Sequence, residues 1–308
     1  MKPRVVIDFE TRSGLHLPTV GSIKYLHDKQ ADIVCFGYKI DNEPVQLWIP
    51  GHDLPDCIKN PNDYFWIAHN TQFDYQVWHL LGTPKYHFPP NHISNWIDSM
   101  ALCGRFTYPQ KLELAGKVLK LDIQKNPRGK ALIKKICDPP FNFTHAELFE
   151  FYDYCKDDVR TTHELVKALP ASQLSEEEQT NWELTVAINH NGLPVDVEAA
   201  KQIYKLTEAY KEEQNKLLPD LTDGQVTKAT QTQRIGKWLR NKGVKVPNMQ
   251  APTVEKLLKR LDLTDDVRTV LMLRQELGRS STAKFLKIID QEYDGRIFMN
   301  ERYYGVPA

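Results

Sequence analysis

The clearest hydrophobic pattern of the chain lies near its start, where the β-branched residues Val5, Val6 and Ile7 are followed by alternating acidic and aromatic positions. β-Branched runs of this kind favour a buried strand. Further apolar runs bounded by turn residues predict four more strands, at 32–40, 45–49, 64–68 and 96–102. We expect the first three strands to form an antiparallel meander, and the last to run into a helix.

Helical spacing predicts a mixed first part and a helical second part. In the first part the expected helices are 22–28, 73–81, 112–121, 131–137 and 145–168, the last opened by a capping box of Thr144 and Glu147. In the second part they are 175–191, 196–217, 231–242, 253–261, 264–278 and 280–292, followed by a short strand at 295–299. The segment 170–175 predicts a boundary between domains at 1–170 and 171–308.

The composition is that of an ordinary globular protein, with 41% hydrophobic and 26% charged residues among 308. No apolar run is long enough to cross a bilayer, and no signal-peptide core precedes the first strand. The five cysteines are scattered without a C-x-x-C pair, which argues against a zinc ribbon and a disulfide framework. These features predict a cytoplasmic protein with no membrane partner.

Charge is unevenly distributed, although the net charge is zero. Residues 201–308 carry 20 Lys and Arg against 14 Asp and Glu, which leaves 20 against 26 for residues 1–200. An acidic half joined to a basic half fits a metal site beside a region that binds phosphates. Chance asymmetry between two domains is the open alternative.

Two carboxylates follow the first strand at alternate positions, Asp8 and Glu10. Alternate side chains of a strand point to the same face, so both should emerge together. Buried side by side they would repel, and a divalent cation held by oxygen ligands, Mg²⁺ or Mn²⁺, would relieve that repulsion. A solvated pair of acids on an edge strand is the alternative.

Two further acids occur in similar settings. Asp74 comes just after the strand that ends near Asn70, at the start of a predicted helix, where the helix dipole favours a negative charge. Tyr154 and Asp158 lie four residues apart on the longest predicted helix and therefore share one face. The alternatives are a simple first-turn acid for Asp74 and a half-buried core tyrosine for Tyr154.

Taken in order, these residues resemble the three motifs of the DEDD superfamily of 3′→5′ exonucleases. The motifs are Asp8-x-Glu10, then Asn70-x-x-Phe73-Asp74, then Tyr154-x-x-x-Asp158. The tyrosine is that of the DEDDy branch, because the histidine position of the DEDDh branch holds Asp153. The resemblance implies an α/β, RNase H-like (DnaQ-like) fold, in which a mixed five-stranded sheet is flanked by helices and followed by a mostly α-helical domain.

The sequence also resembles the proofreading region of phage-type family A DNA polymerases. The segments that carry this resemblance are 128–133, 189–196, 280–284 and 294–296. In these polymerases the helical region after 189–196 leads into the thumb, and the last two segments resemble the far end of the thumb. The sequence contains no palm aspartate motif, no H-D-E motif and no fingers helix with a nucleotide-binding lysine. Two expectations follow: a piece of a longer polymerase that stops before the palm, or half of a split polymerase whose partner is a separate palm-and-fingers polypeptide.

The resemblance implies two-metal hydrolysis of a phosphodiester bond, with the two ions about 4 Å apart. Asp8 would bridge both ions, Glu10 and Asp158 would complete the first metal site, and Asp74 would reach the second. Tyr154 would orient the attacking water, since a phenol with a pKa of about 10 is a poor base at neutral pH.

The implied partners are the single-stranded 3′ end of DNA and a primer-template. The residues expected to contact substrate are Phe9, Thr11, Asn70, Phe73, Lys125, Arg128 and Lys130. The alternative for each aromatic residue is a position in the core. The alternative for each lysine is a solvated position on the surface. Two other functions stay open: a non-catalytic DNA-binding replication scaffold, and a stand-alone DEDD exonuclease that acts on DNA or RNA.

Overall fold

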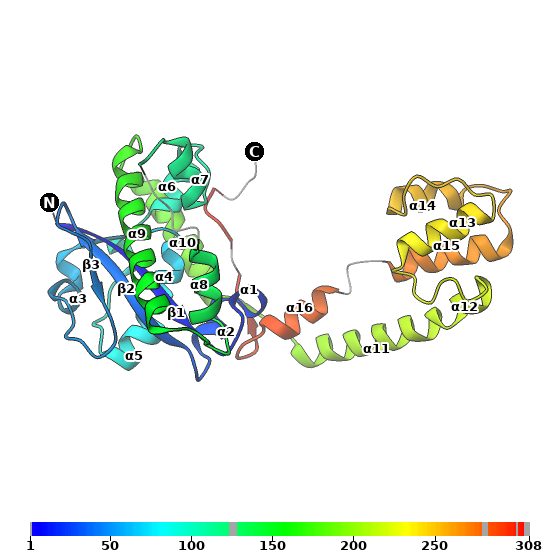
Figure 1. The fold of residues 1–308 in the computed structure, drawn as a ribbon, viewed down its shortest axis with the longest axis horizontal. Helices are drawn as coiled ribbons and strands as arrows, with labels where there is room; N and C mark the ends of the chain where they lie inside the picture. Colours follow the sequence, from blue (N-terminus) through cyan, green and yellow to red (C-terminus); the bar gives the residue numbers. More distant parts are fainter. Residues whose placement is uncertain (1, 123–127, 279–282, 300, 305–308) are drawn as a thin grey trace. The chain divides into compact units, whose positions relative to one another are not determined.

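The computed structural model describes residues 2–122, 128–278, 283–299 and 301–304. The chain divides into two compact units. Unit 1 comprises residues 1–195 and 291–308, and unit 2 comprises residues 196–290. Each unit is described in turn, with the elements labelled as in Figure 1.

Unit 1 is built on a five-stranded sheet in the order β3-β2-β1-β4-β5. The strands are β1 (Arg4–Arg12), β2 (Asp32–Ile40), β3 (Gln46–Trp48), β4 (Phe65–Ala68) and β5 (Trp96–Asp98). β1 pairs antiparallel with β2 and parallel with β4, so the sheet is mixed, and β2 pairs antiparallel with β3. The five predicted strands and the meander are confirmed, and β5 ends at Asp98, where the next helix begins.

Helices cover this sheet (Figure 1). They are α1 (Leu17–Val20), α2 (Ser22–Leu26), α3 (Asp56–Lys59), α4 (Thr71–Val77), α5 (Thr83–Tyr86), α6 (Ser99–Arg105), α7 (Leu112–Val118), α8 (Gly129–Ile136), α9 (His145–Ala168) and α10 (Glu176–Asn191), with short helices at Pro61–Asp63, Trp78–Gly82 and Ile93–Asn95. The predicted capping box is confirmed, because the Thr144 side chain accepts a hydrogen bond from the Glu147 amide at the start of α9. α9 packs on β1 and β2, and the centre of the core is aromatic, with Trp66, Trp78 and Trp96 fully buried.

The structural division differs from the boundary predicted at 170–175. Trp182 and Val186 of α10 belong to the core of unit 1. β6 (Leu193–Pro194) then pairs with β7 (Arg296–Ile297), which returns the end of the chain to unit 1. A helical pattern shows that α10 buries one face, but it does not show which core receives that face.

Unit 2 is helical. Its elements are α11 (Val197–Asn215), α12 (Leu217–Leu221), α13 (Thr232–Asn241), α14 (Ala251–Leu258), α15 (Asp265–Leu277) and α16 (Ala283–Gln291), the last ending one residue beyond the division. Trp238, Val270 and Leu271 lie at the centre of a separate hydrophobic core. These helices confirm the predicted ones, except that the expected helix 196–217 is divided into α11 and α12 at Lys216.

The predicted fold class is therefore confirmed: a mixed five-stranded sheet flanked by helices, of the RNase H-like type, with a helical part after it. Within the described residues, no helix has the length and apolar character needed to span a bilayer. All five cysteines are described, and all are buried and free.

Candidate active site

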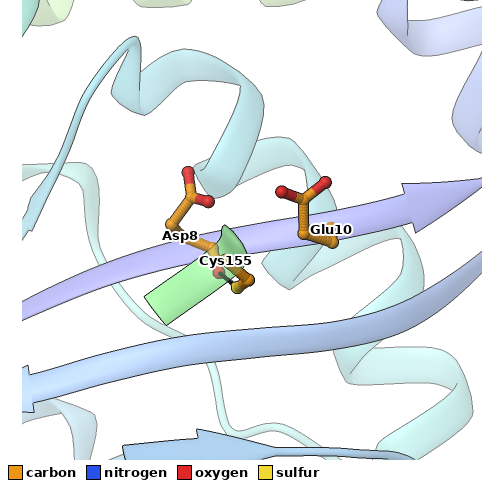
Figure 2. A group of neighbouring side chains, drawn as sticks. All are labelled: Asp8, Glu10 and Cys155. Carbon is orange, nitrogen blue, oxygen red and sulfur yellow. Dashed lines mark hydrogen bonds between the residues drawn. The ribbon is translucent and has the colours of Figure 1, made fainter. Parts of the chain in front are cut away.

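The predicted pair of acids lies on the central strand of unit 1. Asp8 and Glu10 are half-buried, and Figure 2 shows their carboxylates projecting to the same side of β1. Ligand atoms of Asp8, Glu10 and Cys155 all lie within 4.8 Å of one another. The pairing of β1 with β2 shifts register just after Glu10, a β-bulge of the kind often found beside active sites.

Asp74 lies in the first turn of α4, as predicted, and only 3% of it is exposed. Its carboxylate accepts a hydrogen bond from the Phe9 amide at 3.1 Å, which ties the helix to β1 between the two acids of that strand. Burial raises the pKa of Asp74 to about 8, although the bond from Phe9 acts in the opposite direction. A carboxyl group in this environment keeps its proton unless a cation compensates its charge.

Tyr154 and Asp158 share one face of α9, as their spacing predicts. Their side chains are hydrogen-bonded, and burial followed by the charge of Asp158 raises the pKa of Tyr154 above its usual value. The tyrosine ring stacks on Phe151 at 6.0 Å between centroids and lies against Gly129, the first residue of α8. The phenol is therefore fixed in place and neutral.

The four carboxylates form one electrostatic cluster. Burial raises the pKa of Asp8 well above its usual value, and the charges of Asp74 and Asp158 raise it further. Burial also raises the pKa of Glu10, followed by the charges of Asp8, Asp158 and Asp74. Carboxylate oxygens that repel one another are donors suited to hard divalent cations such as Mg²⁺ or Mn²⁺.

Cys155 has a different role beside this cluster. Its sulfur accepts a hydrogen bond from the Gly37 amide at 3.1 Å and donates one to the Asp8 carbonyl at 3.6 Å. Burial raises the pKa of the thiol well above its usual value. We interpret Cys155 as a packing residue between α9 and two strands, since hard cations prefer oxygen to sulfur.

A cleft of about 600 Å³ opens beside the acids. Asp8, Tyr154 and Asp158 lie in its wall, together with Asn70 and Lys130. Asn70 is exposed in the left-handed conformation, with φ 70°, and its amide donates to Asp98 at 3.1 Å. The cleft therefore joins the acidic cluster to polar and basic side chains.

The structure does not bring the other predicted substrate residues into this cleft. Phe9 is 4% exposed and packs on Phe36 in the core, and Thr11 is buried with its hydroxyl hydrogen-bonded to that of Tyr25 at 3.2 Å. The expected contact of Phe9 and Thr11 with substrate is therefore wrong, because both side chains are buried in the protein. Phe9 points to the face of β1 opposite to Asp8 and Glu10, and Thr11 follows the bulge after Glu10.

Phe73 and Arg128 are also outside the cleft wall. Phe73 is half-buried against the core of unit 1. The Arg128 guanidinium forms ion pairs with Glu150 at 2.7 Å and Glu147 at 3.6 Å. Lys125 and residues 280–282, which the sequence also singled out, lie outside the described residues.

Sequence reasoning missed several residues that line the cleft. They are His69, Met100, Gln110, Lys111, Leu112, Glu113, Gly116, Lys117, Leu121, Asp157, Thr161 and Arg302. Lys111 lies immediately before α7 and Lys117 lies on it. Their positive charge was the one sequence signal that could have indicated a phosphate-binding position. Arg302 comes from the far end of the chain, which no local pattern could place beside Asp8.

Comparison with known proteins finds one related sequence. No protein-family model matches the chain. The chain is 25% identical over 302 residues to a DNA polymerase of Bacillus phage SP02, in an alignment that covers 91% of this chain and 45% of that protein.

Two solved structures are similar at low sequence identity. The POL domain of Pol1 from M. smegmatis, in complex with DNA primer-template and dNTP, matches with a TM-score of 0.55 at 9% identity, over 96% of this chain and 48% of that chain. The catalytic core of RRP6 from Trypanosoma brucei matches with a TM-score of 0.30 at 10% identity, over 92% of this chain and 74% of that chain.

The chain spans about half the length of the two polymerases that it matches. Its sheet order and helical second part agree with the fold expected from the motifs. The chain is therefore similar to a phage DNA polymerase over most of its length, and its first unit has the RNase H-like fold, with acids in the order of the DEDD motifs.

Proposed function

We propose that unit 1 is a metal-dependent 3′→5′ exonuclease that hydrolyses phosphodiester bonds at single-stranded DNA 3′ ends and proofreads for a DNA polymerase. The observation that carries this proposal is the placement of four acids around one end of β1. The carboxylates of Asp8 and Glu10 lie within 4.8 Å of each other, Asp74 is tied to the Phe9 amide between them, and Asp158 shares the cleft wall with Asp8. Tyr154 and the cleft lie directly beside these acids. Carboxylates placed in this way are the ligand set of two-metal phosphodiester hydrolysis.

The four acids would hold the divalent cations. Bound cations of this kind activate water and stabilise negative charge on phosphate oxygens. Tyr154 supplies orientation and not proton removal, because its pKa is raised by burial and by Asp158 and its hydroxyl stays protonated at neutral pH. A fixed hydroxyl beside Asp158 can position one water or one phosphate oxygen by a hydrogen bond.

The cleft wall supplies contacts for the nucleic-acid strand. Lys111 and Lys130 line it, and no ion pair is found for either among the described residues. Lys117 is paired with Glu113 at 2.9 Å. Lysines in a cleft that also holds the acids would bind backbone phosphates while the cations bind the phosphate to be cleaved.

Unit 2 supports a DNA-binding role of its own. The exposed side chains of α13 include Arg234, Lys237 and Arg240, and this helix contains no acid. Its opposite face buries Ile235 and Trp238 in the core of the unit. A basic face held by a fixed helix suits the DNA backbone, and the relationship to a polymerase favours DNA over RNA.

The first test is a cleavage assay on a 5′-labelled single-stranded DNA oligonucleotide with Mg²⁺, Mn²⁺ or EDTA. The proposal predicts a ladder of products that shorten from the 3′ end and that vanish in EDTA. A 3′-phosphorothioate end should slow the first step, because it replaces an oxygen near the cations. Intact DNA under all metal conditions, with DNA binding retained, would support the scaffold alternative instead.

Replacing Tyr154 by phenylalanine tests the orienting role of the hydroxyl. The change should lower kcat roughly tenfold, because one orienting hydrogen bond is lost while the ring still fills its site. The affinity for metal, measured by titration calorimetry, should stay the same. A Tyr152→Phe variant is the matched control, since Tyr152 packs edge-to-face against Phe149 elsewhere on α9. Equal kcat for Tyr154→Phe and wild type would contradict the role.

Metal should stabilise the protein, most strongly at higher pH. The folded pKa of Asp74, about 8, lies above the value near 4 of an unfolded aspartate, so the folded state holds the extra proton in between. Metal-free protein should therefore lose stability as pH rises from about 5 to 8. Metal at about a hundredfold its Kd should add ~2.7 kcal/mol and raise the Tm by roughly 5–10 °C.

Thermal unfolding in EDTA and in Mg²⁺ or Mn²⁺ across this pH range measures the effect. Asp74→Asn should reduce the pH dependence in EDTA, because the substituted amide does not titrate, and the raised pKa values of Asp8 and Glu10 account for the part that remains. A Tm that responds neither to metal nor to pH would show that the acids do not form a cation site.

A further inference from the structure

The segment 301–304 brings an arginine to the cleft from beyond unit 2 in the sequence. After β7 the chain lies along unit 1, and Arg302 lines the same cleft as Asp8 and Asp158. Arg302 is exposed, and no ion pair is found for it among the described residues. Within the described residues its guanidinium is therefore a cation of the cleft wall that no carboxylate approaches to ion-pair distance.

A buried asparagine holds the backbone of this segment. The Asn189 side chain on α10 is fully buried. Its amide nitrogen donates to the Glu301 carbonyl at 2.8 Å and to the Gln72 side chain at 2.7 Å, and its oxygen accepts from the Glu301 amide at 2.9 Å. One side chain thus binds both backbone groups of the residue before Arg302 and connects them to α4, the helix that carries Asp74.

A second anchor follows Arg302. The Tyr304 carbonyl accepts from the Gln110 side chain at 2.7 Å, and the Tyr304 hydroxyl donates to Glu178 at 3.1 Å. The tyrosine lies over Gly104, where an added Cβ would be 2.8 Å from the Cβ of Tyr304. Tyr303 packs against the core of unit 1. Anchors on both sides of Arg302 fix its position at the cleft.

We propose that Arg302 is a substrate-binding residue of the cleft, which binds a backbone phosphate of the strand whose 3′ end lies at the acids. The inference rests on the proposed function and extends it. Arginine binds phosphate oxygens through two parallel hydrogen bonds, and its charge does not depend on pH. Lys117 is already paired with Glu113. Arg302 lines the same cleft as Asp8 and Asp158, whose negative charges repel a phosphate, and a cation there would offset that repulsion.

The consequence is that the cleft of unit 1 takes a substrate contact from residues that follow unit 2. Every group of the acidic cluster lies within the first 160 positions of the chain, and Arg302 lies more than a hundred positions further on. The strand-binding site is therefore complete only when the segment 301–304 is docked through Asn189 and Tyr304.

The test compares Arg302→Ala, Arg302→Lys and Lys59→Ala in DNA binding. Lys59 is an exposed lysine of α3 paired with Asp56 outside the cleft, so its substitution is the control for a lost positive charge. Binding of a 5′-fluorescein oligothymidylate is measured by anisotropy in EDTA, where metal-dependent cleavage stops. Arg302→Ala should raise Kd about tenfold and reduce the slope of log Kd against log salt by about 0.7, the value for one lost phosphate contact on a single strand.

Arg302→Lys should keep the salt slope and lose about threefold in affinity, because the charge stays but the paired hydrogen bonds do not. In cleavage assays Arg302→Ala should raise KM about tenfold and leave kcat within about twofold. A Tm equal to that of the wild type shows that the variants are folded.

The outcomes separate this inference from the exonuclease proposal. If the wild type cleaves DNA but Arg302→Ala matches Lys59→Ala in Kd, salt slope and KM, the inference about Arg302 is overturned and the exonuclease stands. If Arg302→Ala weakens binding as expected but no protein cleaves DNA with any metal, Arg302 is supported as a DNA contact and the exonuclease proposal fails.

Discussion

Replacing Asp8 by asparagine is expected to lower the exonuclease rate by at least about a thousandfold, which corresponds to ~4 kcal/mol of transition-state stabilisation. Asp8 lies between the other acids of the site: its ligand atom is within 4.8 Å of that of Glu10, it shares the cleft wall with Asp158, and Asp74 is bound to the amide of the next residue. The amide has nearly the shape of the carboxylate but lacks its charge. The loss therefore measures cation binding and not packing.

The same substitution should raise the stability of the metal-free protein. Asp8 is half-buried among like charges, so its carboxylate opposes folding when no cation is bound. The neutral amide removes that repulsion. We expect Asp8→Asn to have a higher Tm than the wild type in EDTA and to lose most of the further rise that metal gives. A gain in stability together with loss of activity is the usual sign of a site that strains the fold.

Asp153→Ala is the matched control. Asp153 lies on α9 close to the site in sequence, but it is exposed and paired with Lys156 at 2.7 Å. Its substitution should leave both activity and metal response within about twofold, as is common for exposed ion pairs. The assignment of the site would be refuted if Asp8→Asn retained near-normal activity, or if Asp153→Ala lost as much.

The second large effect is expected from Gly129→Ala, about a hundredfold in kcat. An added Cβ at Gly129 would lie 2.6 Å from Cε2 and 2.9 Å from Cδ2 of the Tyr154 ring. The ring has little room to yield, because it stacks on Phe151 in the small core shared by α8 and α9. The hydroxyl must shift relative to Asp158, and misplacement by about 1 Å is enough to cost a rate of this size.

Global stability should change little in this variant. Alanine is favoured over glycine in a helix by up to about 1 kcal/mol, which offsets part of the clash. Gly236→Ala on α13 is the control, because its added Cβ meets only the end of Arg240 at 3.6 Å. In a Tyr154→Leu background, where no ring meets the new methyl group, Gly129→Ala should have little further effect on kcat. A full additional loss there would show that Gly129 acts by another route.

The sequence predicted much of this architecture because the signals were local. The run Val5–Ile7 marks a buried strand, and the alternation of Asp8 and Glu10 places both on one side of it, as Figure 2 shows. The spacing of Tyr154 and Asp158 on α9 likewise needs only helix geometry. The capping box at Thr144 predicted the first residue of that helix, His145.

What the sequence did not predict depends on contacts between distant segments. Phe9 carries an aromatic ring next to two acids, and only the sheet shows that the ring faces the core. The helical pattern of α10 does not show that Trp182 packs in the core of unit 1. The pairing of Leu193 with Ile297 joins residues about a hundred positions apart, so the expected boundary at 170–175 missed the return of the chain.

That return makes unit 2 an insertion within unit 1. The Val195 amide donates to the Gly295 carbonyl at 3.0 Å, so the chain leaves unit 1 and re-enters it at one place. The entropy needed to close a flexible loop grows only with the logarithm of its length, by about 0.6 kcal/mol for each doubling. If the helices of unit 2 melted, their 95 residues (196–290) would become such a loop, still closed by the β6–β7 ladder. Unit 1 would therefore keep its last segment through a partial unfolding event, and the two units can follow separate cooperative transitions on one thermogram.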